Sequence, residues 1–144
     1  METEAMGRVT VEALIENLHD AYNVEGGLIP PESARKILVA DALVDTGATL
    51  LSLPVSLIRQ LGLSRFATKR VTSSIGLAEV GIYQAVRLTT QGRTCSMDVM
   101  EVPDGVPVLI GQLPLEHLDF VFDLRDRKLI GNPAHGGEHM YEPY

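Results

Sequence analysis

The sequence of 144 residues has a single cysteine, no tryptophan and few aromatic residues, which make up 5% of the chain. One cysteine excludes an internal disulfide and a cysteine-rich zinc module. Hydrophobic residues make up 45% of the chain, so a sizeable core is expected, and it must be mainly aliphatic. The length predicts one domain over residues 1–144, with a core at about 8–131 and an irregular tail at 132–144.

The sequence also lacks an apolar run of 18 residues, and no apolar segment follows a positive region near its start. These absences predict neither a transmembrane helix nor a signal peptide, so a cytoplasmic protein is expected. Positive charge is scarce, and the net charge is −7. Neither nucleic acid nor an anionic membrane is therefore an expected partner.

Short apolar segments separated by turn residues predict an all-β fold with one or two short helices, closed into a barrel-like single lobe. Residues 8–15 alternate as a strand, although 13–18 also fit a helix. The polar segment 17–31, with its Gly and Pro pairs, predicts a loop. The apolar run 36–44 predicts a strand buried on both faces. Further strands are expected at 71–74, 79–88, 93–101, 106–110, 120–124 and 128–130, and short helices at 54–61 and 113–118.

One tripeptide contains the acid that is best suited to catalysis. Asp45-Thr46-Gly47 places an acid at a sharp turn between two apolar runs, and the small residue Ala48 follows it. Asp and Gly are common turn residues, so the tripeptide alone is typical of an ordinary turn. The same acid beside a second carboxylate could share one proton with it, so that one member activates water and the other protonates a carbonyl oxygen.

The wider context of this turn favours catalysis. Residues 43–49, followed by the apolar run 50–54, resemble the retropepsin-like aspartic protease family, which is single-lobed and of the retroviral type. Val108-Leu109-Ile110-Gly111 resembles the second signature of that family, two apolar residues and a glycine just before a short helix. About sixty residues and a hairpin separate the two signatures. The resemblance runs from about residue 9 to 130.

The resemblance implies a role for each matching residue. Asp45 would be the catalytic aspartate, and Thr46, Gly47 and Ala48 would support its loop. The second signature would pack beneath that loop, and a hairpin tip would form the flap that closes over the substrate. The second-signature residues are Leu109, Ile110 and Gly111, and the flap residues are Ser74, Ile75, Gly76 and Leu77.

A single-lobed chain supplies one aspartate, whereas the reaction needs two. The resemblance therefore implies a homodimer with Asp45 of both chains at the two-fold axis and an extended peptide or protein substrate between them. Asp41 and Asp123 lie near apolar runs, but neither is followed by Thr-Gly. The expected activity is that of an aspartic endopeptidase without cofactor or metal. The alternative is a catalytically silent or latent dimeric module that acts in binding or scaffolding.

The chain departs from the viral pattern in two places. Viral enzymes often carry an Asp soon after the first signature and an Arg after the second. This chain has Thr49 or Leu50 and Gln112 at those places, which favours a cellular or bacterial branch.

The tail offers a rival interpretation, because His135 and His139 have the His-x-x-Glu-His spacing of a metallopeptidase class. That motif requires a helix, which the intervening Gly-Gly disfavours, so a solvated tail or a segment packed on a partner subunit is expected instead.

Overall fold

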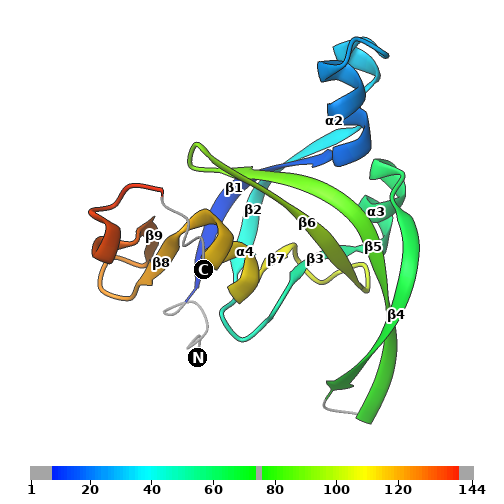
Figure 1. The fold of residues 1–144 in the computed structure, drawn as a ribbon. Coiled ribbons are helices and arrows are strands. Elements are labelled where there is room, and N and C mark those ends of the chain that lie inside the picture. The colour runs from blue at the N-terminus through cyan, green and yellow to red at the C-terminus, as the bar shows by residue number, and fades with distance from the viewer. Residues whose placement is uncertain (1–7, 74–75, 140–144) are drawn as a thin grey trace.

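The computed structural model describes residues 8–73 and 76–139. Within them, the strands are β1 (Val9–Asn17), β2 (Lys36–Val44), β3 (Leu51–Pro54), β4 (Ser64–Ser73), β5 (Gly76–Thr90), β6 (Arg93–Val102), β7 (Leu109–Ile110), β8 (Phe120–Asp123) and β9 (Lys128–Gly131). The first seven form one sheet in the order β1-β2-β7-β3-β6-β5-β4, in which β1 also pairs with β5, and β8 pairs with β9. The β1–β5 pairing joins the sheet into a ring, from which the β4–β5 hairpin projects (Figure 1). The all-β, single-lobed prediction is confirmed.

Short helices complete the fold, and none in the described part of the chain is long and apolar enough to cross a membrane. The helix expected after Pro54 ends at Gly62, which adopts φ 65° as a left-handed cap. The other predicted helix, at 113–118, is confirmed with one more residue at its start. The helical elements are α2 (Leu18–Glu25), α3 (Val55–Leu61) and α4 (Gln112–Leu118), with 3₁₀ turns at η1 (Pro31–Ser33) and η2 (Pro133–His135).

The core is aliphatic, as the composition predicts. Val44, Ile110, Leu51 and Val99 lie in register across β2, β7, β3 and β6, and none is more than 5% exposed. Opposite residues of paired strands share one face of a sheet, so these four side chains form a continuous row inside the ring. Burying each such side chain contributes about 1.5–3 kcal/mol to folding.

The prediction of a loop at 17–31 is wrong, because α2 occupies its first half. The Asn17 side chain accepts a hydrogen bond from the Asp20 N–H at 3.0 Å, which caps the first turn of the helix. The buried Asp20 carboxylate accepts two hydrogen bonds from the Arg35 guanidinium, and these hold the pKa of Asp20 below its usual range. The helix alternative for 13–18 is also wrong, since β1 continues through Asn17.

The strand at 36–44 has the predicted bounds, but it is not buried on both faces. Leu38 is 62% exposed, and of this strand only Ala42 and Val44 are fully buried. A bulge sets residues 40 and 41 of β2 against the single residue Glu12 of β1. The apolar run therefore reflects a core at one end of the strand only. The strand expected at 106–110 is also shorter, because only Leu109–Ile110 pair as β7.

Candidate active site

Asp45 lies where β2 ends and the chain turns toward β3. Its N–H still donates to the Ile110 carbonyl at 3.0 Å, so the strand pairing extends to this residue. The chain then turns tightly, because the Ala48 N–H donates to the Asp45 carbonyl and the Gly47 N–H to the Asp45 carboxylate oxygen Oδ1 at 3.0 Å. This local hydrogen bond is typical of an Asx turn and orients the half-buried carboxylate.

The second signature holds this turn in place from the other side. The Gln112 and Leu113 N–H groups donate to the Ala48 and Thr49 carbonyls at 2.8 and 2.9 Å. A Cβ atom at Gly111 would lie only 2.6 Å from the carbonyl oxygens of both Ala48 and Leu50. The approach is this close because position 111 has no side chain. The structure thus brings together the two signatures that the sequence separates by about sixty residues.

Asp41 and Asp123, the two acids considered as intrachain partners of Asp45, are engaged elsewhere in the described structure. Asp41 is exposed in the β2 bulge. Asp123 accepts hydrogen bonds from the backbone N–H groups of Arg125 and Asp126, so it caps its own turn between β8 and β9. Thr46 is exposed, and within the described ranges its hydroxyl makes no hydrogen bond. Neither of the two acids considered as intrachain partners is therefore placed to form a pair with Asp45.

The Asp45 side chain projects from a face of the sheet that continues onto one face of the β4–β5 hairpin. Val44 points into the core, so the next extended residue projects to the opposite face, which is that of Leu43. Residues that pair across neighbouring strands continue this face from β2 to β4, on the side of the sheet opposite the core row. Its members are Leu43 on β2, Leu109 on β7, Ser52 on β3, Met100 on β6, Ile82 on β5 and Ala67 on β4.

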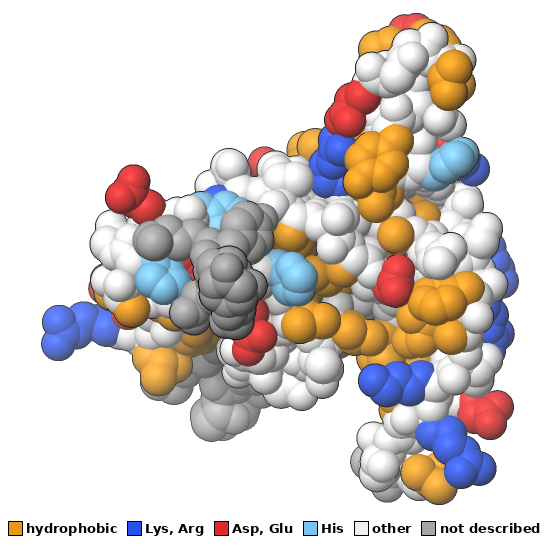
Figure 2. Space-filling view, viewed as in Figure 1, with side chains coloured by type: hydrophobic (Ala, Val, Ile, Leu, Met, Phe, Trp, Pro, Cys, Tyr) orange, Lys and Arg blue, Asp and Glu red, His pale blue; other side chains and the backbone are white. Residues whose placement is uncertain are grey.

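The hairpin and the Asp45 turn lie at the same end of the molecule (Figure 1). In the space-filling view the hairpin projects from the body and leaves a notch beside it, bordered by exposed hydrophobic side chains (Figure 2). Of the four expected flap residues, Ser74 and Ile75 lie outside the described residues. Gly76 adopts φ 119° and is exposed, and Leu77 is 72% exposed.

Glu101 fastens the base of this hairpin, a role that sequence reasoning missed. The β5–β6 ladder ends at the pair Ile82–Met100, and the next N–H of β5, that of Gly81, donates to Glu101 Oε2 at 2.9 Å. The Tyr83 hydroxyl donates to Glu101 Oε1, also at 2.9 Å. The Gly81 hydrogen bond holds the pKa of Glu101 below its ordinary range, and the carboxylate in turn raises the pKa of Tyr83. The sequence did contain a signal for this role, because Glu101 is an acid at a position where the alternation of the strand turns side chains toward the core.

The described part of the tail, residues 132–139, packs on the body and does not form a helical metal motif. His135 and His139 contact different partners, the Asp119 carboxylate at 2.6 Å and the His117 carbonyl at 3.0 Å. Gly136 and Gly137 between them both have positive φ angles, which interrupt any helix. Within residues 8–73 and 76–139, no cluster of three His, Cys, Asp or Glu side chains is placed to hold a metal ion.

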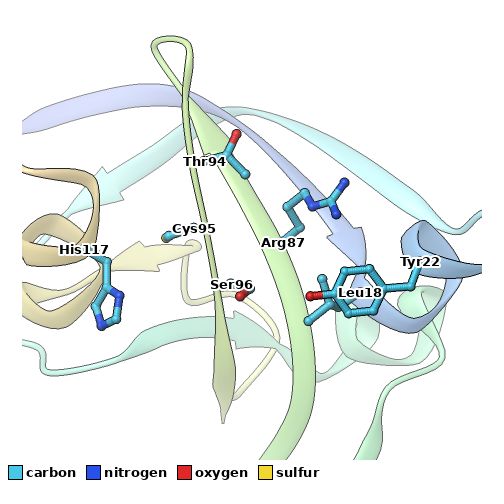
Figure 3. Close-up of a pocket in the computed structure, with 7 residues that line it drawn as sticks. All are labelled: Leu18, Tyr22, Arg87, Thr94, Cys95, Ser96 and His117. Atoms are coloured by element: carbon cyan, nitrogen blue, oxygen red, sulfur yellow. The ribbon is translucent and has the colours of Figure 1, made fainter. Parts of the chain in front are cut away.

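A separate pocket of about 400 Å³ lies over β6 between α2 and α4, with Tyr22, Arg87, Cys95 and His117 among its lining residues (Figure 3). Burial raises the pKa of the Cys95 thiol to about 11, so the thiol is protonated at neutral pH. A protonated thiol is a poor nucleophile. Cys95 therefore acts as a small core residue.

Comparison with known proteins agrees with this geometry. A family model described as aspartyl protease matches residues 36–113, which is more than half of the 144-residue chain. The matched region begins at β2, includes the Asp45 turn and the hairpin, and ends just past the second signature. A comparison with curated proteins finds no match to the chain.

Replacing Gly111 by alanine tests whether the close contact at Gly111 holds the Asp45 turn in place. The new methyl group would meet two backbone carbonyls that no side-chain rotation can move. We expect the free energy of unfolding to fall by about 2–3 kcal/mol, measured by urea denaturation. Gly26→Ala is the control, because Gly26 has φ −83° and its Cβ would meet no atom closer than 3.4 Å. Equal stability of the two variants would contradict the close approach.

The two hydrogen bonds that Glu101 accepts from Gly81 and Tyr83, here called the Glu101 clamp, should make the stability of the fold depend on pH. Because the folded-state pKa of Glu101 lies below its ordinary value of 4.5, the stabilisation is complete above that pH and is lost as the pH falls through the lowered value. In Glu101→Gln we expect lower stability at pH 7 and a shallower loss between pH 5 and 3, followed by thermal melting. The control is Glu79→Gln, which alters an exposed carboxylate of the same hairpin. Parallel pH curves for wild type and Glu101→Gln would refute the clamp.

Proposed function

The chain belongs to the aspartyl protease family, and on this premise we propose that it is an endopeptidase in which Asp45 of two chains forms the catalytic pair. The observation that carries the proposal is the Asp45 turn itself. Its carboxylate is oriented by the Gly47 N–H, and its backbone is held by the residues after Gly111. The two candidate acids of the same chain, Asp41 and Asp123, lie in the β2 bulge and in the turn between β8 and β9. A site with one well-positioned carboxylate is complete when a second copy faces it across a two-fold axis.

Two facing carboxylates share one proton, because two adjacent negative charges repel. The ionised Asp45 takes a proton from a water molecule, whose oxygen attacks the peptide carbonyl carbon. The protonated Asp45 of the partner subunit gives its proton to the carbonyl oxygen, and a tetrahedral diol results. The first Asp45, which now holds the water proton, gives it to the peptide nitrogen, while Asp45 of the partner subunit takes a proton from a diol hydroxyl. The C–N bond breaks, a carboxylic acid and an amine leave, and the pair again holds one proton.

The surrounding residues support this chemistry by rigidity and by binding. Thr46 is exposed beside Asp45, where its hydroxyl could meet the loop of the second chain. Ala48, fixed by Gln112, prevents the turn from relaxing. The β4–β5 hairpin supplies a strand to which an extended peptide could pair. Gly76 and Leu77 at its described end belong to the proposed flap, together with Ser74 and Ile75.

Replacing Asp45 by asparagine should abolish cleavage, because the amide cannot take up the proton of the water. We expect the rate to fall by about 10²–10⁴-fold in a peptide library read by mass spectrometry. Asp41→Asn, which alters an exposed carboxylate on the same strand, should cleave like wild type. Cleavage that survives in Asp45→Asn would refute the assignment. No cleavage by wild type would favour the silent or latent binding module.

Mixing experiments test the shared site. When wild type is incubated with an equal amount of Asp45→Asn, about half of the wild-type chains enter mixed pairs, which lack one carboxylate. Activity per wild-type chain should fall by about half, whereas added Asp41→Asn should cause no loss. Sedimentation at micromolar concentration should show a dimer. A monomer with undiminished activity in the mixture would contradict the two-chain mechanism.

A further inference from the structure

The two faces of the β4–β5 hairpin differ in chemistry. Directly opposite residues of an antiparallel pair project to the same face, so the register sorts the side chains into two sets. The face continuous with Asp45 carries the pairs Ala67–Ile82, Lys69–Val80 and Val71–Ala78. The other face carries Thr68–Gly81, Arg70–Glu79 and Thr72–Leu77. Among these pairs the first face is apolar apart from one lysine, whereas the second is mostly polar, with Leu77 as its one large apolar side chain.

Lys69 is the only charged side chain on the first face of the described hairpin. It is exposed and lies opposite Val80, and in the described parts of the chain its ammonium group has no hydrogen bond or ion pair. Arg70, one residue away, lies opposite Glu79, so an acid of opposite charge faces it across the strands. The lysine thus presents an unbalanced positive charge on the face that leads to Asp45.

The surroundings of Lys69 favour a ligand with a carboxylate. Its aliphatic stem can lie along the apolar side chains of this face while the ammonium reaches beyond them. The net charge of the chain is −7, but salt screens charges more than about 8–10 Å away. For a peptide bound along the hairpin, the nearby lysine therefore outweighs the distant acids.

We propose that Lys69 selects substrates carrying Asp or Glu within a few residues of the cleaved bond. The inference rests on the proposed endopeptidase function and adds a specificity-determining residue to it. An ion pair in a partly desolvated cleft should favour acidic over basic side chains at the contacted position by about fivefold. The preference runs against the overall negative charge of the protein, which makes it a discriminating observation.

The test is to digest a proteome-derived peptide library with the full chain and count residues at four positions on each side of every cut. Wild type should show about fivefold enrichment of Asp and Glu over Lys and Arg at one position or more. Lys69→Glu should reverse the preference, and Lys69→Met, which keeps an aliphatic stem, should remove it. Arg70→Glu is the matched control, because it changes the charge equally on the opposite face and should leave the pattern unchanged.

Several results would overturn the inference. These are cuts by wild type without acidic enrichment, or an Arg70→Glu shift as large as that of Lys69→Glu, with all variants folded by circular dichroism. If wild type makes no cuts, the proposed function fails, and peptide binding decides the inference separately. Immobilised acidic peptides should then retain Asp45→Asn protein better than their Lys-substituted counterparts, and Lys69→Glu should reverse this order. Equal retention would refute the role of Lys69.

Discussion

The candidate site depends on one close backbone contact, in which Gly111 lies against the carbonyls of Ala48 and Leu50. The contact exists because β7 lies between β2 and β3 and bonds to both, in parallel with one and antiparallel with the other. The turn that carries Asp45 is therefore clamped from the strand before it and from the segment after Gly111. The catalytic role proposed for Asp45 requires its carboxylate to keep its position to within fractions of an ångström, and this double attachment of the turn provides the needed rigidity.

The same sheet register that buries the core also organises the opposite face. Val44 and its in-register neighbours fill the ring, so the alternate residues, Asp45 among them, face outward from it. The hairpin continues this outward face beyond the body, and Glu101 fastens the hairpin where its ladder with β6 ends. The packing of the core, the position of the Asp45 turn and the face of the hairpin thus follow from one set of strand pairings.

Much of this fold could be predicted from local patterns. The strand expected at 93–101 and the short helices expected at 54–61 and 113–118 each depend on a few neighbouring residues, and each is confirmed to within one residue at either end. The loop prediction for 17–31 failed because Gly and Pro pairs outweighed the capping signal of Asn17 and Asp20. The burial prediction for 36–44 failed because an apolar run does not say which faces are covered.

The sequence by itself determined the family, the all-β class and the single Asp-Thr-Gly turn, since these reside in short contiguous motifs and their order. Only the tertiary structure decided which distant residues act together. The contact of Gly111 with Ala48, the clamp of Glu101 on Gly81 and the shared face of Asp45 and Lys69 all depend on strand register. Register is set by the packing of the whole sheet, and a shift of one residue would turn every side chain of a strand to the other face.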